Sequence, residues 1–243
     1  SLEEHIARSG LEDYFGEEFY GVISTELGGG NTAEALYVGA LLDRYIIDAD
    51  PAGRSVPELQ HSTYYLNDLP IFPLACANQY GDTAILTHVV NDKRAEALVR
   101  AMAVASKNRI GVVDHPPQAK DLKNAVIQGA FSQAWEIGRV FREAKEKNTL
   151  AAPQIAKAAG GFLLFRGKVS KNIFDTVEGF TVGDVFINGQ GDDANSQYHI
   201  WYKNEHLMAW RDDQADVTAP DLICVFNDDT NEPIINPHFT EGM

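Results

Sequence analysis

The chain has 243 residues, of which 44% are hydrophobic, so it can bury a substantial core as one large domain or two smaller ones. It carries 35 acidic and 20 basic residues, and a net charge of -15 argues against nucleic acid and acidic membranes as partners. The two cysteines lack the spacing of a disulfide framework or a zinc site, and no apolar run reaches the ~18 residues of a membrane span, so we expect a cytoplasmic protein.

The chain begins inside a predicted helix, which covers residues 2–8. These residues lack the basic region followed by an apolar region that marks an export signal. Such an abrupt start leads us to expect an upstream segment that the sequence does not include.

Three consecutive glycines form the most informative place in the sequence. Gly28, Gly29, Gly30 and Asn31 separate a β-prone run from an apolar helical stretch at residues 33–42. Residues without Cβ let a ligand approach the backbone, and the unpaired N–H groups at the start of a helix attract anionic or carbonyl oxygen. We therefore predict that these four residues bind substrate.

A second predicted strand, Tyr45 to Asp50, ends in two aspartates. Asp48 and Asp50 are two residues apart, so in a strand their carboxylates point to the same face. The strand, the glycine turn and the helix between them make a βαβ unit, which collects polar groups at the carboxyl edge of its sheet. Gly28 precedes Asp48 by 20 positions, as in dinucleotide folds, but the third glycine of that fingerprint is absent, so a nicotinamide-dependent oxidoreductase is a weak alternative.

The loop at residues 48–60 is stiffened by two prolines and dense in polar groups. Asp48 and Asp50 are candidates to bind a divalent cation or activate water, and Glu58 is a candidate base. Arg54 is suited to hold a carboxylate of the substrate. The alternative is an ion pair of Arg54 inside the loop that only holds its shape.

His61, His88 and His115 show none of the spacings of a histidine metal site, so a hydrogen-bonded structural role is the alternative for each. His115 lies on a stiff Pro-Pro turn beside Asp114, and it is the histidine that we predict as a metal ligand together with Asp48 and Asp50.

Helical periodicity predicts a helix over residues 91–107, a second after Pro116-Pro117, and a third that carries the stripe Phe131, Trp135, Gly138 and Phe141. Core packing is our interpretation of this stripe. A short helix from Pro153 ends at the glycines of positions 160 and 161.

After Gly161 short β-prone runs alternate with turn residues, which predicts an antiparallel sheet or barrel. We expect strands at residues 162–165, 180–187, 198–202, 207–210 and 222–226. This change from helical to β-prone sequence predicts a domain boundary. We expect an α/β first domain at residues 1–158 and an all-β second domain at residues 159–243. Asn204 and Glu205 follow a strand that carries Trp201, and we predict that they contact substrate.

Six runs along the chain carry a resemblance to a known family. They are Leu27–Asn31, Asp48–Asp50, Gly53–Gln60, Gly161–Val169, Gly191–Ala194 and Pro220–Val225. In this order, and spread from about residue 12 to residue 233, they resemble the S-methyl thiohydantoin desulfurase-like family. The resemblance implies a three-layer α/β/α first domain and a β-barrel-like second domain. The glycine-rich segment that such proteins carry further upstream has no counterpart here.

The resemblance implies chemistry on a hydantoin-like or thiohydantoin-like ring, whose cyclic amide or thioamide carbon is attacked by water. It assigns the ring or its carboxylate to Gly28–Asn31, activation of water or metal binding to Asp48, Asp50 and Glu58, and orientation of an anionic substituent to Arg54. Gln60 completes the polar loop as a further substrate contact. We therefore expect a hydrolase for a small-molecule substrate, in a homo-oligomer. The alternative is a non-catalytic partner subunit of a hydantoinase or oxoprolinase-type system.

Overall fold

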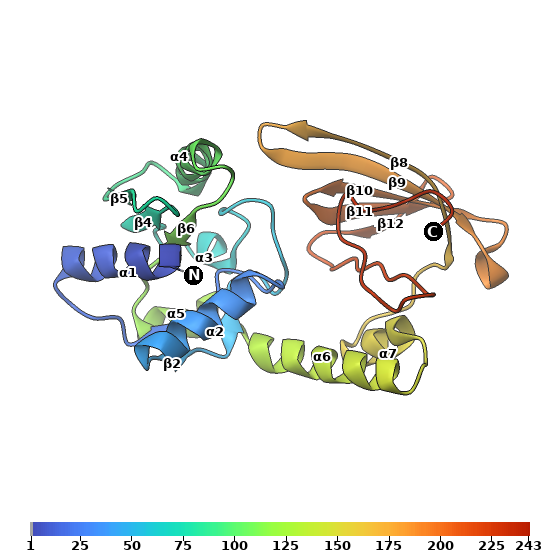
Figure 1. Cartoon of the computed structure of the whole chain (residues 1–243), viewed down its shortest axis with the longest axis horizontal. Helices are drawn as coiled ribbons and strands as arrows, with labels where there is room; N and C mark the ends of the chain where they lie inside the picture. Colours follow the sequence, from blue (N-terminus) through green and yellow to red (C-terminus); the bar gives the residue numbers. More distant parts are fainter. Residues whose placement is uncertain (1) are drawn as a thin grey trace. The chain divides into compact units, whose positions relative to one another are not determined.

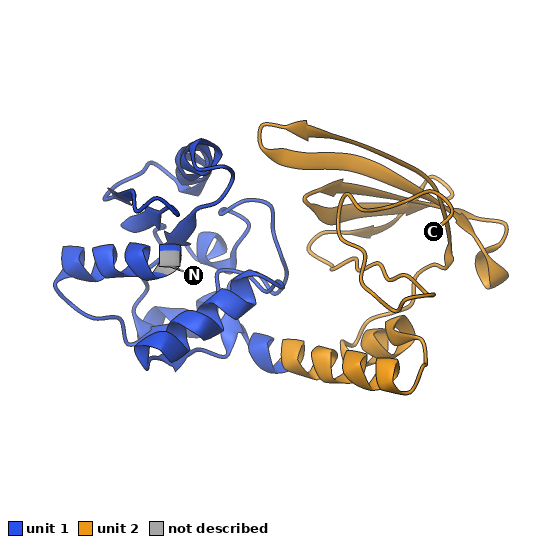
Figure 2. Ribbon diagram, in the orientation of Figure 1, with its two compact units in different colours: residues 1–132 blue, residues 133–243 orange. Residues whose placement is uncertain are grey.

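The computed structural model describes residues 2–243, except for the side chains of residues 2 and 4. The chain forms two compact units, residues 1–132 and residues 133–243, which Figure 2 colours blue and orange. The domain boundary expected at residues 158 and 159 lies inside the second unit and stays a prediction.

Unit 1 mixes short strands with helices (Figure 1). Its elements are α1 (Leu2–Phe15), β1 (Gly21–Val22), α2 (Asn31–Leu42), β2 (Tyr45–Ile46), β3 (Ala49–Asp50), α3 (Thr63–Leu66), β4 (Leu74–Ala77), β5 (Thr83–Leu86), α4 (Asp92–Ala105), β6 (Gly111–Val113), α5 (Ala119–Ala125) and β7 (Ile127–Gln128). The next helix, α6 (Ala130–Glu146), begins in unit 1 and continues into unit 2.

The βαβ unit predicted around the glycine turn is confirmed. β1 pairs with β2 in parallel, with Gly21 opposite Tyr45, and α2 connects them. A Cβ on Gly39 of α2 would lie 2.5 Å from the side chain of Ile46, so the helix approaches β2 as closely as a glycine permits.

The single strand expected from Tyr45 to Asp50 is instead two strands in different sheets. The chain turns after β2, where the N–H of Ala49 donates to the carbonyl of Ile47 at 2.8 Å. β3 then pairs antiparallel with β7, so Asp50 lies opposite Ile127. Because the turn interrupts the alternation of side chains, the argument that placed Asp48 and Asp50 on one face does not apply.

The core of unit 1 surrounds β4, which is buried over its whole length between β5 and β6. Alternate residues of β4 serve two apolar clusters: Ala75 and Ala77 pack with α1, whereas Leu74 and Cys76 pack with α4. The strands of unit 1 are divided among three small sheets rather than aligned in one. The three-layer architecture expected for the whole first domain is therefore not confirmed.

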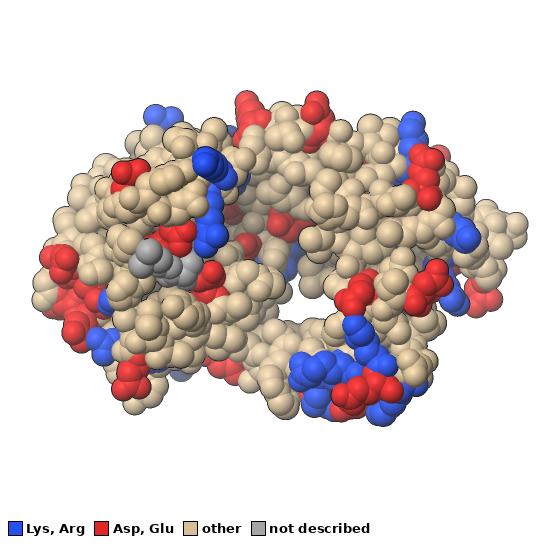
Figure 3. Space-filling view, in the orientation of Figure 1, with Lys and Arg blue, Asp and Glu red and all other residues tan. Residues whose placement is uncertain are grey.

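The helix predicted over residues 91–107 is confirmed as α4. Asn91 caps it, since its side-chain oxygen accepts a hydrogen bond from the N–H of Arg94. The helical stripe near residue 131 lies on α6, but Trp135 is 65% exposed, so this stripe is not wholly a core face. Where α6 and α7 lie, basic and acidic side chains gather together (Figure 3), and Arg139 pairs with Glu136 and Glu143 along α6.

Unit 2 continues from α6 with α7 (Ala151–Ala158) and an antiparallel sheet. Its strands are β8 (Gly167–Val177), β9 (Phe180–Gly189), β10 (Gln197–Lys203), β11 (Glu205–Arg211) and β12 (Gln214–Thr218), with the 3-10 helix η1 (Gly191–Asp193) between β9 and β10. The strand order is β12-β11-β10-β9-β8, so each strand pairs with its neighbours in sequence. The antiparallel sheet predicted from the sequence is confirmed.

The barrel-like form implied by the family resemblance is not confirmed. Within residues 167–218 the first and last strands do not pair, and the sheet stays open. One face of the sheet is covered by the irregular C-terminal segment at residues 219–243, whose Ile223 and Phe239 pack with Val185 and Ile200. This segment supplies the burial that closing a barrel would have supplied. The strands expected at 162–165 and 222–226 are irregular, apart from one bridge between Phe226 and Pro233.

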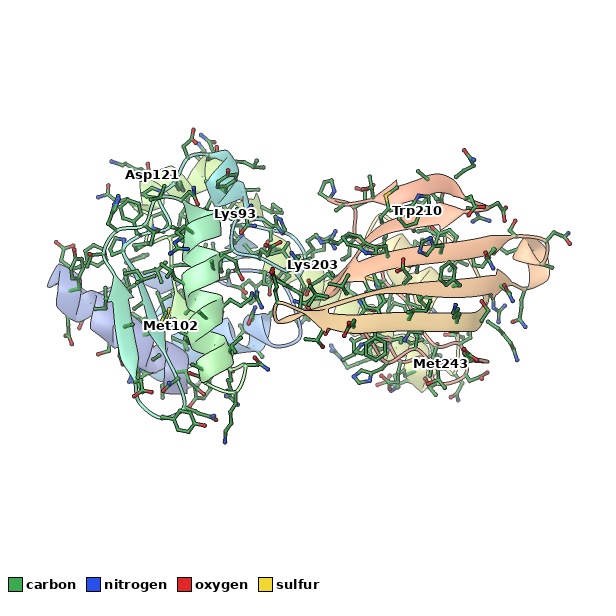
Figure 4. The ribbon with its side chains drawn as sticks, turned by 90° about the horizontal axis from the view of Figure 1, so that it is seen from above. Lys93, Met102, Asp121, Lys203, Trp210 and Met243 are labelled. Carbon is green, nitrogen blue, oxygen red and sulfur yellow. The ribbon has the colours of Figure 1, made fainter. Side chains whose placement is uncertain are left out.

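Three rings stack across the other face of the sheet. Phe186 of β9, His199 of β10 and Trp210 of β11 are cross-strand neighbours, with ring centroids 4.5 and 4.6 Å apart. Asp184 holds the middle ring, with its Oδ1 2.6 Å from the Nε2 of His199. Figure 4 labels Trp210 at the end of this stack.

Candidate functional site

The glycine turn and the acidic loop lie against one another in unit 1. The N–H of Leu27 donates to the Asp50 carboxylate at 2.9 Å, and the hydroxyl of Ser55 donates to the carbonyl of Leu27 at 2.9 Å. The N–H of Val56 donates to the carboxylate of Glu26. These bonds join two segments about 25 residues apart in sequence into one rigid platform.

Asp50 holds this platform from inside. Its side chain is fully buried, and it accepts hydrogen bonds from the N–H groups of Leu27 and of Gly53, the latter at 2.8 Å. Burial raises the pKa of the Asp50 carboxyl, while the backbone N–H groups of Gly53, Leu27 and Ala52 act in the opposite direction. A carboxylate bound in this way orders the loop and is shielded from substrate.

Asp48 has a different partner, at the surface. Its carboxylate accepts hydrogen bonds from the hydroxyl of Ser132, at 2.6 Å, and from the N–H of Ser132, at 3.0 Å. These bonds lower the pKa of Asp48, the hydroxyl contributing most. Since Ser132 lies in the first turn of α6, the carboxylate stabilises the start of that helix. The structure therefore does not bring the two aspartates together as a pair.

The glycines differ from one another in their surroundings. A Cβ on Gly28 would lie 2.5 Å from the hydroxyl oxygen of Ser55, so this glycine permits the close approach of the two segments. Gly29 and Gly30 are exposed, and a Cβ on either would meet no atom within 4 Å. Gly30 provides no side-chain cap for α2, while Asn31 donates from its side chain to Glu26 at 2.7 Å. The start of α2 is thus an exposed backbone surface.

The far end of the loop carries a carboxylate beside an imidazole. The Glu58 Oε2 lies 3.9 Å from the Nε2 of His61, and the Glu58 side chain is 18% exposed. The Oε1 of Gln60 is buried and has no hydrogen-bond partner among the described residues. Arg54 is buried, and its Nε donates to the carbonyl of Ser55 at 3.1 Å. Of these loop side chains, Glu58 combines acidity with access to solvent.

The helix α4 fixes this end of the loop. Glu96 accepts a hydrogen bond from the N–H of Leu59 at 3.0 Å and pairs with Arg100 one turn further along. Arg100 in turn donates to the carbonyl of Pro57 at 3.1 Å. The positions of Glu58 and Gln60 are therefore set by a buried polar face of α4, which the loop sequence alone could not show.

A buried cluster around His115 is the part of unit 1 that sequence analysis described least completely. The imidazole lies between two carboxylates, with Nδ1 2.8 Å from Asp114 and Nε2 3.2 Å from Asp92. Burial lowers the pKa of His115, but the hydrogen bonds and charges of Asp114 and Asp92 outweigh it, so the pKa is raised. The ring of Tyr64 lies 4.9 Å from the imidazole, between centroids.

Two polar atoms in this cluster have no hydrogen-bond partner among the described residues, the hydroxyl of Tyr64 and the Oδ2 of Asp114. Burial raises the pKa of Tyr64, and the charges of Asp114 and Asp50 add to the effect, so the cluster is adjacent to the acidic loop. The sequence drew attention to His115 and Asp114. Asp92 was not identified, because no local pattern shows that the start of α4 meets the Pro-Pro turn.

The residues predicted as metal ligands do not form a ligand set. Asp48 binds Ser132, Asp50 binds backbone N–H groups, and His115 has a carboxylate at each ring nitrogen. In the described part of the chain, no group of three or more histidines, cysteines and acidic residues is arranged to hold a metal ion. The three residues thus do not fit one shared cation.

Asn204 and Glu205 belong to unit 2, where they connect β10 and β11. Asn204 has φ of 56°, and its Oδ1 accepts a hydrogen bond from the N–H of Thr181 at 2.9 Å. Its side chain therefore supports the end of the β8–β9 hairpin. Contact of these two residues with substrate stays a prediction.

Comparison with known proteins agrees with this architecture. The family model described as the S-Me-THD-like N-terminal domain matches residues 3–88, and that described as the S-Me-THD-like C-terminal domain matches residues 90–243. The search of curated proteins found no match. No helix within residues 2–243 is long and apolar enough to cross a membrane.

A solved structure has the same fold. The crystal structure of a protein from Chromobacterium violaceum, a structural-genomics target, matches 90% of this chain with a TM-score of 0.67 and 24% sequence identity. The matched region is 58% of that protein's chain, so the present chain spans little more than half of its length. The two consecutive family matches cover nearly the whole chain and lead to one conclusion. The chain belongs to the S-Me-THD-like family, and it contains both the N-terminal and the C-terminal domain of that family.

Proposed function

We propose that the protein is a hydrolase acting on a hydantoin-like or thiohydantoin-like ring. Water would attack a cyclic amide or thioamide carbon, and the ring would lose its sulfur substituent or open. Membership of the S-Me-THD-like family supports the substrate class.

The observation that carries the proposal is the exposed start of α2 beside the acidic loop. Gly29, Gly30 and Asn31 offer backbone N–H groups at the positive end of the helix dipole. Asp50 and Ser55 hold this turn rigidly through Leu27. A rigid set of N–H donors is suited to bind the carboxylate or the ring oxygen of a small planar acid.

We assign the role of general base to Glu58. The carboxylate takes a proton from water while the water oxygen bonds to the ring carbon that bears sulfur. The carbon–sulfur bond then breaks, and the leaving sulfur takes the proton back from Glu58 to form a thiol. The second proton of the water moves from oxygen to the adjacent ring nitrogen, so that a ring carbonyl results. His61 lies close enough to Glu58 to orient it. Asp48 and Asp50 act as positioning residues, and Arg54 and Gln60 shape the loop beneath the substrate.

The test is turnover of a carboxylated S-methyl thiohydantoin. The release of methanethiol is the quantity measured. We expect Glu58→Gln to lower kcat at least ~100-fold while the melting temperature changes little, because the Glu58–His61 pair is near the surface. Glu17→Gln is the matched control, since Glu17 is an exposed acidic residue of unit 1 outside the loop. Full activity of Glu58→Gln would exclude Glu58 as the base.

The alternative function is a non-catalytic partner subunit of a hydantoinase or oxoprolinase-type system. The observation in its favour is that both Asp48 and Asp50 are engaged by protein groups, as in a structural module. The same assay separates the two functions, because a partner subunit is inert alone. A wild-type protein that turns over neither hydantoin nor thiohydantoin would favour this alternative.

A further inference from the structure

The strand β8 is an edge of the sheet in unit 2 (Figure 4). On one side it pairs with β9 along its length. On the other side Val169 exchanges backbone hydrogen bonds with Gly242 and Met243. Beyond that point, over residues 171–177, the described part of the chain supplies no strand to the outer side of β8.

The turn that joins β8 to β9 determines which backbone groups face outward. Glu178 and Gly179 have φ of 52° and 84°, and Val177 pairs with Phe180 across this two-residue turn. The closing pair of such a turn is hydrogen-bonded, so Val177 and every second residue back to Lys171 direct their backbone groups to β9. A register shift between Val169 and Lys171 ends this alternation. The backbone N–H and C=O groups of Asn172 and Phe174 therefore point away from the sheet.

This free edge carries exposed apolar side chains. Ile173, Phe174 and Val177 are 48%, 52% and 50% exposed. Natural proteins protect exposed apolar edge strands, because their unpaired backbone groups add a further strand readily. An exposed edge strand with such apolar side chains is typical of a site where a strand of another chain adds to the sheet.

The sequence of the edge is complementary to itself in the antiparallel direction. Lys171 and Asp175 lie at equal distances on either side of Ile173, and neither forms an ion pair within the described part of the chain. Two such strands that meet with Ile173 opposite Ile173 bring each lysine opposite an aspartate. Opposite charges in such cross-strand pairs are stabilising.

We propose that β8 is a dimerisation strand, which pairs antiparallel with β8 of a second copy of the chain around Ile173. Asn172 of each copy then lies opposite Phe174 of the other, and the backbone groups of these residues exchange four hydrogen bonds. The two five-stranded sheets become one continuous sheet of ten strands. The inference concerns unit 2 alone and does not depend on the proposed function.

The outward backbone groups restrict the register. Only registers that place even-numbered residues opposite one another form the hydrogen bonds. A register with Phe174 opposite Phe174 satisfies this condition, but it places Asp175 against Ile173 and leaves Lys171 opposite Val177. The register around Ile173 pairs the charges instead.

Exchange of the two charges tests the proposal. By sedimentation velocity we expect the wild-type protein to be dimeric at protein concentrations of tens of micromolar. The variants Lys171→Asp and Asp175→Lys should each associate about tenfold more weakly, because each places like charges opposite one another at two positions of the dimer. The double variant Lys171→Asp/Asp175→Lys should regain the wild-type dimer. A wild-type protein that stays monomeric, or single variants that associate as the wild type does, would overturn the proposal.

A cross-link tests the register. In the Cys224→Ser background, which removes the exposed native thiol, Ile173→Cys places two thiols at a non-hydrogen-bonded site, where the Cα atoms are about 4.5 Å apart. Treatment with diamide, which accepts the two electrons, should yield a disulfide-linked dimer on a non-reducing gel. Val177→Cys is the matched control, since it is equally exposed but does not meet its own copy. Equal cross-linking of both variants would exclude this register.

Discussion

Asp50 illustrates at the scale of a single residue how burial decides the role of a carboxylate. Its side chain is fully buried, and its oxygens are bound by the N–H groups of Leu27 and Gly53. A residue that activates water must be reached by water, whereas a residue that orders a loop must be rigid. The contacts of Asp50 meet the second requirement.

We predict that Asp50→Ala lowers the free energy of unfolding by about 2–4 kcal/mol, because two buried N–H groups lose their acceptor. Asp50→Asn keeps one acceptor oxygen and should cost less. Urea denaturation of the three proteins measures the difference. An Asp50→Ala protein of wild-type stability would show that the carboxylate does not hold the platform.

Gly28 and Gly29 are adjacent, yet the same substitution should affect them differently. In Gly28→Ala the new methyl group would lie 2.5 Å from the hydroxyl of Ser55, which must then release the carbonyl of Leu27. We expect a loss of about 1–2 kcal/mol, measured as a fall in melting temperature. Gly29→Ala is the matched control and should unfold as the wild type does, since nothing lies within 4 Å.

The added substitution Ser55→Ala removes the atom that the methyl group meets. The double variant Gly28→Ala/Ser55→Ala should therefore lose less stability than the sum of the two single variants. Strict additivity would mean that the two positions do not touch.

The residue scale also shows where sequence analysis was limited. The sequence identified Asp48, Asp50 and His115 as unusual, because polar residues were concentrated beside predicted buried strands. It could not show that Ser132, 84 positions away from Asp48, supplies its hydrogen bonds. Burial and partners depend on contacts between distant segments, which local patterns do not contain.

At the scale of elements, the start of α4 and the turn after β6 are joined by His115. Its imidazole is nearly enclosed between Asp92 of α4 and Asp114 of the turn, with Tyr64 of α3 against the ring. A charged imidazole offsets the cost of two buried carboxylates. The cluster therefore ties three elements together through charge rather than through apolar contact alone.

The pH dependence of stability should report this cluster. The raised pKa of His115 means that the folded state holds the proton more tightly than the unfolded state. The contribution of His115 to the free energy of unfolding is therefore fully present below pH about 6.5 and is lost as pH rises through the pKa of the folded state. The raised pKa of Asp92, caused chiefly by burial, acts in the same direction. We expect the melting temperature to fall as pH rises above about 6.5.

His115→Gln is the informative variant. It should lower the free energy of unfolding by about 3–5 kcal/mol near pH 6, because both carboxylates lose their cationic partner. It should also flatten the decline of the melting temperature toward alkaline pH. A wild-type protein whose melting temperature is constant over this range would contradict the assignment of the charge to His115.

Elements with strong periodicity were predicted well. Helix α4, the βαβ unit around α2 and the central strands β9, β10 and β11 all follow from local pattern and turn residues. The exception was the strand expected from Tyr45 to Asp50. Tyr45, Ile46 and Ile47 favour a strand, but a local turn at Ile47 and competing partners divide the segment between two sheets.

At the scale of the whole molecule, the succession of α/β and β-rich parts could be read from the sequence, and the family resemblance is confirmed. The sequence could not show whether the sheet of unit 2 closes into a barrel or stays open. Whether an antiparallel sheet closes or stays open depends on what covers its faces, and here the C-terminal segment covers one of them. This segment has little regular structure, so strand-forming patterns in the sequence do not reveal that it covers the sheet.

The distribution of indole side chains across the fold has an experimental consequence. All three tryptophans, at positions 135, 201 and 210, fall within residues 133–243, and Trp210 stacks on His199. Intrinsic tryptophan emission is therefore a signal from one half of the protein, while tyrosine absorbance and far-ultraviolet dichroism sample both. Two denaturation curves recorded on the same sample, one by tryptophan emission and one by far-ultraviolet dichroism, would reveal whether the two units unfold together or in succession.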